Sequence, residues 1–478
     1  VIIYVIIFFV AGRLFIFNEY EKELMMTGLK KIGRILLRFI PLRDDVVLES
    51  HPDLSDNTYV VYKRLLKEEY NLSHRIYWVI HGDSTDLEFP YNVFPIYLEG
   101  GFKQRLKRVI AIARSRFIID SNTYIHKIKR RQVRLHLGHG MPIKINPSYT
   151  DYGEIGECDG YLTCGMWWNR VYTDMAGIPE DVLLPIGYPR NDILTENTEK
   201  EVEKTGKKRV RDEREKKRKN RGLRSPGYFE GIYKREKYII WMPTYRQHKK
   251  DAAKNADGSY VRDLEMHQLK NDLEIEGGID DDRWELLAMA TLRKKNKPRM
   301  PFGMPEIETA ADLEMLDKRL SDAGLMIYYR PHPSQDMFYV AQMDLMNIRI
   351  ADDVFLRECK ATLYEVIANS CGLITDFSSV YYDYLLTGKP IGLTLRGAGE
   401  FFRKNICIFD DIEKSLAGEK LKSADDVYRF IDGVSSSIDT SDLEEAKKKY
   451  HDVTDGSSLE RVINWLSDHG MDLYTDDK

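Results

Sequence analysis

Four short runs of polar and conformationally special residues each follow an apolar run that is typical of a β-strand. In chain order, they are residues 138–144, 241–246, 329–333 and 375–379. In an open α/β sheet, ligands bind outside the carboxyl ends of the strands, so we expect the four runs to converge. Their imidazole, guanidinium and hydroxyl groups suit phosphate binding and proton transfer.

The first run places His139 between Gly138 and Gly140. Glycines let the backbone turn sharply, which would leave the imidazole open to a cleft. Because imidazole titrates near neutrality, a histidine in this position could act as a general base. A loop with a purely structural role is the alternative interpretation.

The second and third runs carry groups that could bind phosphate. Thr244 and Arg246 follow a strand, and a guanidinium suits bidentate contact with phosphate oxygens. A surface ion pair is the alternative for a single arginine. In the third run, prolines on both sides of His332 hold it in an extended, rigid segment. Such rigidity suits a side chain that donates a hydrogen bond to phosphate from a fixed position better than it suits a core histidine.

The fourth run contains Asp376, Ser378 and Ser379 and precedes a helix expected to begin near Val380. The unpaired N–H groups at a helix start, the helix dipole and two hydroxyls together suit a phosphate. The alternative is that Asp376 or Ser378 is an ordinary N-cap. A Tyr-Glu and a Tyr-Asp pair flank the run, at positions 364–365 and 382–383.

Apolar runs that alternate with helical patterns indicate parallel sheets covered on both faces. In the first half, the expected strands are residues 46–48, 75–80, 117–119 and 133–137. In the second half, they are residues 238–241, 324–329, 348–350, 372–374 and 390–393. Expected helices include residues 58–70, 103–114, 423–433, 442–450 and 457–467.

A chain of 478 residues is too long for one core, so we expect two or three domains. A hydrophobic content of 43% indicates a globular protein. The predicted division is a membrane-associating segment at 1–43, a Rossmann-like domain at 44–195, a charged linker at 196–235, a second Rossmann-like domain at 236–420 with an insertion at 247–309, and C-terminal helices at 421–478.

Charge and cysteine content exclude several classes of partner. Residues 196–224 hold 13 Lys or Arg and 7 Asp or Glu, which indicates a solvated helix or a disordered linker. No aromatic residues are interleaved for base stacking and the net charge is −4, so no nucleic-acid partner is expected. The five cysteines form no CxxC pair and predict neither a zinc site nor a disulfide framework.

The N-terminal segment favours attachment to a membrane. Residues 1–17 are almost entirely apolar but fall short of the roughly 20 that a spanning helix needs, although they could be the tail of a longer span. Residues 24–43 have the pattern of a basic amphipathic helix, which suits an anionic membrane surface. A surface helix packed on its own domain is the alternative. Basic residues after a span would place the protein body at the cytoplasmic face.

The order and content of these motifs resemble those of the CDP-glycerol glycerophosphotransferases, which build teichoic acids and related capsule polymers. The resemblance covers roughly residues 45–415. The matching motifs are His139-Gly140-x-Pro142-x-Lys144, the residues 187–192, 243–246 and 375–379, His332-Pro333 and Lys389-Pro390. Gly138 and Met141 stand where the family usually has Trp and Thr. Both departures flank the expected general base. They therefore put in doubt which acceptor is used more than they put in doubt the class of reaction.

The resemblance implies a GT-B-like α/β fold, in which two Rossmann-like domains with parallel sheets face each other across a cleft. It implies transfer of glycerol phosphate, or a similar polyol phosphate, from a CDP-activated donor to a hydroxyl of a lipid-linked acceptor, with release of CMP. The N-terminal domain would bind the acceptor, and the C-terminal domain would bind the CDP donor. The catalytic residues would be His139 and His332. The substrate-binding residues would be Gly140, Lys144, Thr244, Arg246, Glu365, Asp376, Ser378 and Ser379.

The sequence predicts no cofactor and no set of metal-ligating residues. Whether a divalent metal binds together with the CDP donor stays open at this point. Asp376 and Asp383 are the side chains that could contact Mg²⁺ through it. One alternative function is a GT-B glycosyltransferase that uses a nucleotide sugar in cell-surface polysaccharide synthesis. Another is a catalytically silent, membrane-associated scaffold.

Overall fold

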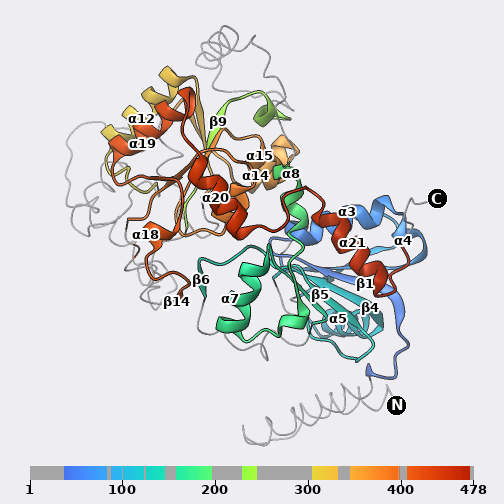
Figure 1. The fold of residues 1–478 in the computed structure, drawn as a ribbon. Coiled ribbons are helices and arrows are strands. Elements are labelled where there is room, and N and C mark those ends of the chain that lie inside the picture. Colours follow the sequence, from blue (N-terminus) through green and yellow to red (C-terminus); the bar gives the residue numbers. More distant parts are fainter. Residues whose placement is uncertain are drawn as a thin grey trace, which may run out of the picture. The chain divides into compact units, whose positions relative to one another are not determined.

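Two sheets of parallel strands form the framework of the protein, seen here in a computed structural model (Figure 1). The structure describes residues 37–82, 88–98, 101–122, 125–145, 158–195, 229–244, 304–331, 345–396, 398 and 406–473. The chain divides into two compact units. The first comprises Val1–Leu137, Ile155–Tyr161 and Trp465–Lys478, and the second comprises Gly138–Glu154 and Leu162–Asn464.

The sheet of the first unit has the strand order β3-β2-β1-β4-β5-β7, and all of these pairs are parallel. Its strands are β1 (Arg43–Glu49), β2 (Ile76–Ile80), β3 (Val93–Tyr97), β4 (Ser115–Asp120), β5 (Val133–His136) and β7 (Gly160–Leu162). Val47 of β1 lies opposite Tyr77 of β2 and Ile118 of β4, and all three are buried. The expected strands at 46–48, 75–80, 117–119 and 133–137 are therefore confirmed.

The sequence does not predict β3, because Pro95 lies in its middle. Proline cannot donate to a strand ladder, so it counts against a strand unless that strand is at an edge. The structure places β3 at the edge of its sheet, where it pairs with β2 alone. Three helices of this unit are α3 (Asp56–Lys67), α4 (Tyr70–Ser73) and α5 (Phe102–Arg114).

The sheet of the second unit has the strand order β11-β10-β9-β12-β13-β15 and is also parallel throughout. Its strands are β9 (Tyr238–Met242), β10 (Met326–Tyr329), β11 (Ile348–Ile350), β12 (Gly372–Thr375), β13 (Ile391–Leu393) and β15 (Glu419–Lys420). The five expected strands of the second half are confirmed. A short antiparallel pair, β6 (Lys144–Ile145) with β14 (Ile406–Cys407), also belongs to this unit. The strand β8 (Leu183–Leu184) follows β7 in the first sheet's order.

The core of the second unit is packed by α12 (Ala310–Ala323) and α19 (Ala424–Ser436), which lie side by side in Figure 1. Leu313, Leu316 and Leu320 recur at helical spacing on one face of α12 and pack against the sheet and α19. The helix begins with a capping box between Thr309 and Asp312, which satisfies two backbone donors at its start.

The remaining helices are short to medium in length and are distributed along the chain. They are α7 (Met166–Ala176), α8 (Asp192–Thr195), α14 (Asp353–Cys359), α15 (Leu363–Ala368), α16 (Val380–Leu385), α18 (Ile412–Ser415), α20 (Ser441–Tyr450) and α21 (Ser458–Asp468), with 3₁₀ turns at Glu180–Val182, Pro189–Asn191 and Ile232–Lys234. The expected start of a helix at Val380 and the three expected C-terminal helices are confirmed.

Each sheet has one topological switch point, where the strand order reverses direction. In the first unit it lies between β1 and β4, and in the second between β9 and β12. In open α/β sheets, ligands bind outside the carboxyl ends of strands at such points. We therefore expect ligand-binding residues among those that follow these four strands.

Three predicted segments lie outside the described residues: positions 1–36, 196–228 and 247–303. The predicted domain boundaries remain predictions. In the part of the chain that the structure describes, every helix is too short or too polar to cross a membrane.

Candidate active site

A buried carboxylate joins the two strand ends at the switch point of the second sheet. Asp376 directly follows β12, and its Oδ1 accepts hydrogen bonds from Thr244 N at 2.9 Å and Thr244 Oγ1 at 2.5 Å. Thr375 Oγ1 donates to the carbonyl oxygen of Met242 at 2.7 Å, which adds a second link. Thr244 and Asp376, both expected at the donor site, are therefore brought together.

The alternative in which Asp376 simply caps the next helix is not what the described contacts show. The N-cap residue of α16 is Ser379, whose side chain makes no capping hydrogen bond. The hydroxyl of Ser378 lies at 3.5 Å from Val380 N, the long limit for a hydrogen bond. Both serines are half-buried, so their hydroxyls line the turn between β12 and α16.

The loop that carries His139 lies directly against this turn. A Cβ atom added to Gly140 would come within 2.6 Å of Ser379 Oγ and 2.9 Å of Ser379 Cβ. Gly140 also has a φ of +141°, which side chains rarely adopt. Only glycine lets the backbone beside His139 approach Ser379 this closely. His139 itself is exposed.

Tyr188 packs against the same loop at Gly138. A Cβ atom on Gly138 would come within 2.9 Å of the Tyr188 hydroxyl, and Gly138 has a φ of +64°. The Tyr188 hydroxyl also contacts Met141 Sδ at 4.0 Å. The residue at position 138 must therefore be small, which gives a local reason for glycine here.

A buried ion pair holds α16 in place. Arg190 Nη2 donates to Asp383 Oδ2 at 2.8 Å, and Asn191 Nδ2 donates to Asp383 Oδ1 at 2.7 Å. The Tyr364 hydroxyl donates to Asp383 Oδ2 at 2.5 Å, and the guanidinium lies over the Tyr364 ring at 4.7 Å. Arg190 Nη2 is also 3.3 Å from the position that a Gly140 Cβ would take. The same guanidinium therefore borders both the histidine loop and α16.

Sequence reasoning quotes Arg190 and Asn191 in a motif but assigns neither a role, and it considers Asp383 only as a Mg²⁺ contact. In the structure, both carboxylate oxygens of Asp383 accept hydrogen bonds from protein donors. An arginine beside an asparagine, directly after Gly-Tyr-Pro, is the signal that could have indicated such a buried pair. Among the described residues, no cluster of His, Cys, Asp or Glu side chains has the make-up of a metal site.

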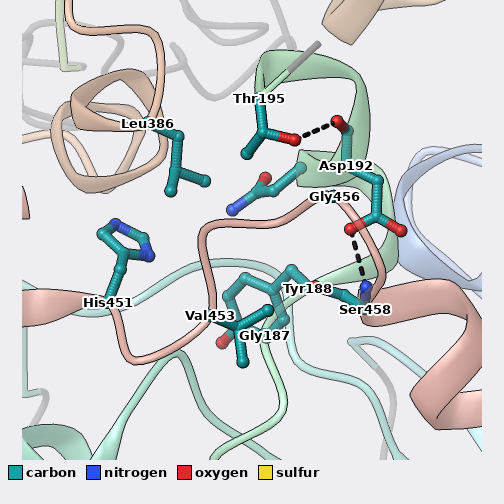
Figure 2. A pocket seen from close by; sticks show the side chains of 10 residues that line it. Gly187, Tyr188, Asp192, Thr195, Leu386, His451, Val453, Gly456 and Ser458 are labelled. Carbon is teal, nitrogen blue, oxygen red and sulfur yellow. Dashed lines mark hydrogen bonds between the residues drawn. The ribbon is translucent and has the colours of Figure 1, made fainter.

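A small hollow in the second unit has His451 in its wall (Figure 2). It is lined by Gly187, Tyr188, Asn191, Asp192, Thr195, Leu386, His451, Val453, Gly456 and Ser458. His451 Nε2 donates to the carbonyl oxygen of Tyr382 at 2.8 Å, and burial lowers the pKa of its imidazole. The hollow measures about 10 Å³, which is room for about one water molecule and too small for a substrate.

Two other predicted or matched residues have structural contacts. Glu365 forms the capping box of α15: its Oε2 accepts from Thr362 N at 2.6 Å and Thr362 Oγ1 at 2.9 Å. Lys389 Nζ donates to the carbonyl oxygens of Ala368 at 2.7 Å and Ser370 at 2.8 Å. Burial lowers the pKa of the Lys389 ammonium. The predicted donor contact of Glu365 stays a prediction.

The remaining predicted residues are only partly described. Lys144 lies in β6, where it pairs with Cys407, and its side chain lies outside the described part of the structure. Arg246 and His332 lie wholly outside it. The structure therefore brings Thr244 to Asp376 and Gly140 to Ser379, with His139 and Ser378 next to these residues in the chain.

Comparisons with known proteins give a family and a fold. A model of the family described as CDP-Glycerol:Poly(glycerophosphate) glycerophosphotransferase matches residues 35–468. No curated protein matches the chain in sequence.

Among solved structures, the chain is similar to the wall teichoic acid polymerase TagF, with a TM-score of 0.59 and 16% identity over 95% of this chain and 98% of TagF. A histidine-to-asparagine variant of TagF soaked with CDPG has the same TM-score of 0.59 at 16% identity, over 95% of this chain and 98% of the variant. The UDP-GlcNAc 2-epimerase of Methanocaldococcus jannaschii has a TM-score of 0.43 and 11% identity over 88% of this chain and 99% of the epimerase. The similarity to TagF confirms the expected GT-B-like α/β class.

Proposed function

Since the chain belongs to the CDP-glycerol:poly(glycerophosphate) glycerophosphotransferase family and is therefore a transferase of glycerol phosphate, we propose that its acceptor is a lipid-linked, teichoic-acid-like polymer at the cytoplasmic face of the membrane. A hydroxyl oxygen of the acceptor attacks the phosphorus that carries glycerol. The bond between this phosphorus and the CMP oxygen breaks, and CMP leaves. The acceptor gains one glycerol phosphate through a new phosphodiester.

The observation that carries the assignment of roles is the close approach of Gly140 to Ser379. It supports a site in which a histidine and two serine hydroxyls act on the same substrate. In this proposal, His139 accepts the proton of the acceptor hydroxyl. Ser378 and Ser379 donate hydrogen bonds to the donor phosphates, where negative charge must be stabilised during phosphoryl transfer.

Asp376 and Thr244 act as positioning residues in this proposal. The two hydrogen bonds between them fix the turn after β9 relative to the turn that carries Ser378. The sequence motifs add Arg246 and His332 as donors to the pyrophosphate, and Lys144 and Glu365 as further substrate contacts. A rigid arrangement matters because positioning supplies much of the catalysis in phosphoryl transfer.

The experiment that tests the proposal is CMP release from CDP-glycerol and CDP-ribitol, with a membrane extract as the acceptor. The intact chain is compared with His139→Ala, and His74→Ala serves as the control because His74 lies on α4's C-terminal side, in the other unit. We expect CMP release with one donor, a loss of about 10²–10⁴-fold in His139→Ala, and no loss in the control.

Two results would contradict the proposal. If the folded protein releases CMP from neither donor, nucleotide sugars become the donors to test and the glycosyltransferase alternative gains support. If His139→Ala keeps full activity, the general base is another group. For the membrane location, the test is removal of residues 1–43: a protein that stays in the membrane fraction without them is attached in another way.

A further inference from the structure

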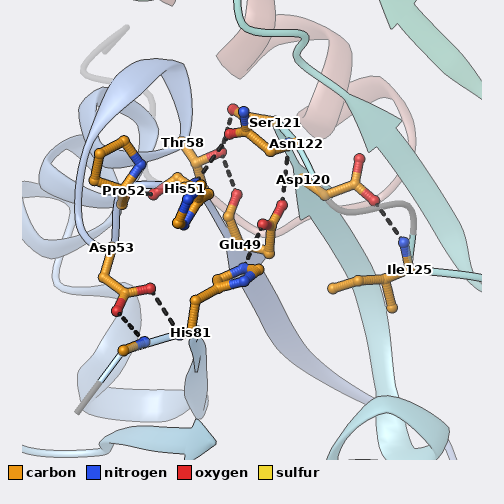
Figure 3. A network of polar contacts seen from close by, with 12 residues as sticks. Glu49, His51, Pro52, Asp53, Thr58, His81, Asp120, Ser121, Asn122 and Ile125 are labelled. Carbon is orange, nitrogen blue, oxygen red and sulfur yellow. Dashed lines mark hydrogen bonds and ion pairs between the residues drawn. The ribbon is translucent and has the colours of Figure 1, made fainter. Parts of the chain in front are cut away.

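A second polar cluster lies at the switch point of the first sheet, and no motif of the sequence singles it out (Figure 3). It is built from the residues that end or follow β1, β2 and β4. Glu49 is the last residue of β1 and is fully buried, His81 directly follows β2, and Asn122 follows β4. Three strand ends of one sheet therefore contribute to one cluster, at the edge where such sheets bind ligands.

Glu49 binds the other two strand ends. His81 Nε2 donates to Glu49 Oε1 at 2.7 Å, and Asn122 N donates to Glu49 Oε2 at 3.1 Å. The hydrogen bond that His81 donates to Glu49 raises the pKa of the imidazole, although burial opposes this rise. A positive charge on this imidazole is therefore favoured at higher pH than in an isolated histidine.

The neighbouring carboxylate is likewise occupied by protein donors. Asp53 Oδ1 accepts from His81 N at 2.8 Å, and Asp53 Oδ2 accepts from Gly82 N at 3.0 Å. The backbone carbonyl of Glu49 accepts from Thr58 Oγ1 at 2.8 Å, and that hydroxyl is 2.6 Å from Ser121 Oγ. The oxygen acceptors of the cluster therefore bind backbone and side-chain donors of the same cluster, which stabilises the turns after the strands.

Imidazole rings form the outward side of the cluster. His51 is exposed, and its ring centroid lies 5.0 Å from that of His81 (Figure 3). The His51 backbone N–H donates to Asn122 Oδ1 at 3.0 Å, which fixes the backbone that carries this ring. The His81 side chain retains 14% of its exposure. Glu49 is fully buried and both oxygens of Asp53 accept backbone N–H groups, so the imidazole rings, rather than these carboxylates, are the groups suited to an anion at this edge.

We propose that His81 and His51 bind a phosphodiester of the acceptor polymer, with Glu49 as the positioning residue that holds His81. This inference rests on the proposed function, because a poly(glycerophosphate) acceptor carries one anionic phosphodiester in each repeat. A chain of repeats can contact the protein at a phosphate away from the hydroxyl that reacts. The proposed site lies wholly within the first unit, whereas the predicted donor site lies in the second.

The test is a titration of the full chain with a synthetic glycerol phosphate oligomer and, separately, with inorganic phosphate, followed by calorimetry. The variants are His81→Gln and His51→Gln. His74→Gln is the matched control, because His74 precedes β2 at the opposite end of the strand from His81. Loss of one charge-assisted hydrogen bond should weaken oligomer binding about tenfold in each variant and leave the control unchanged.

A kinetic readout separates binding from folding and from chemistry. We expect both variants to raise the KM for the acceptor, with little change in kcat or in the KM for CDP-glycerol. His51→Gln keeps the test valid if His81→Gln does not fold, because His51 is exposed.

A pH series adds a signature that a purely structural role would not produce. The titratable side chains that face His81 include Glu49, Asp53 and His51. Oligomer binding should weaken as the pH rises through the raised pKa of His81. In Glu49→Gln the weakening should begin at lower pH, because the charged partner is gone.

Three outcomes overturn the inference or separate it from the proposed function. Equal oligomer binding in all variants would contradict it. If inorganic phosphate competes with the oligomer on equal terms, the site binds free phosphate and the assignment to the acceptor is wrong. If the oligomer binds through His81 but CDP-glycerol releases no CMP, the site stands and the proposed reaction fails.

Discussion

Each switch point of the two sheets has a buried carboxylate, at the end of β1 in the first sheet and directly after β12 in the second, and the two carboxylates have different partners. In the first sheet, Glu49 accepts from the imidazole of His81. In the second, Asp376 accepts from the backbone N–H and hydroxyl of Thr244. The described side-chain partner of Glu49 at the first edge is therefore an ionisable ring, whereas the described partners of Asp376 at the second edge are a hydroxyl and a backbone N–H. The same fold can therefore present two surfaces with different ligand preferences.

The carboxyl-end edges of the two sheets also differ in the contacts that support them. The turn at the second edge is supported by the buried pair Arg190–Asp383, which joins segments far apart in the chain. At the first edge, the carboxylates of Glu49 and Asp53 are bound by groups on adjacent strand ends. This difference suggests that the second edge depends on long-range support and the first on local support.

The largest expected effect comes from removing that long-range support. Asp383→Asn leaves the buried guanidinium of Arg190 without its charged partner, which should lower the free energy of unfolding by roughly 3–5 kcal/mol. Urea unfolding measures this change. Asp432→Asn is the control, because its pair with Arg319 is exposed and should cost roughly 0–1 kcal/mol. Equal losses in the two variants would contradict the comparison.

A smaller effect is expected at the contact between the histidine loop and the serine turn. Gly140→Ala adds a Cβ that meets Ser379 and imposes strain at a φ of +141°, so we expect a loss of roughly 1–3 kcal/mol and a marked fall in CMP release. Gly177→Ala is the matched control, with a φ of +63° and open space around the added Cβ. It should lose some stability but keep its CMP release, and an equal loss of activity in both would contradict the role of the contact.

The hydroxyl at the second switch point should have a more modest effect. Thr244→Val removes the hydroxyl donor to Asp376 and should cost about 1 kcal/mol, with a rise in the KM for CDP-glycerol. Thr173→Val removes one hydrogen bond of the same unit, to the carbonyl of Ile178, and is the control. If both variants raise the KM for CDP-glycerol equally, Thr244 has no special part in donor binding.

The smallest expected effect is on the pH dependence of stability, where two histidines should act in opposite directions. The pKa of His81 is raised in the folded state, so its contribution is complete below the unfolded value of about 6.5 and is lost as the pH rises through the folded value. His81→Gln should therefore cost more stability at low pH than at high pH. Urea unfolding across a pH series measures the difference.

His451 should behave in the opposite way. Its folded pKa is lowered by burial, so the unfolded state binds more protons as the pH falls below about 6.5, and stability declines there. His451→Gln keeps an N–H donor for Tyr382 but has no proton to gain, so it should lose less stability than the wild type on acidification. The same slope in His81→Gln and His451→Gln would contradict the assigned directions.

Much of the fold could be predicted from short apolar runs. Strands such as β2 and β9 are covered on both faces, so almost every residue in them is apolar and the run is recognisable. Edge strands escape this rule: β3 contains Pro95, and β15 is only Glu419–Lys420. The family could be predicted because several motifs occur in one order, and the match over residues 35–468 confirms it.

The sequence by itself determined the class of fold, the family and which short motifs end the strands, because each depends on residue types close together in the chain. It did not determine which strand ends meet. The contact of Gly140 with Ser379, the pair Arg190–Asp383 and the cluster around Glu49 each depend on strand order. Strand order is set by how the crossovers pack, so only the tertiary structure decided these contacts.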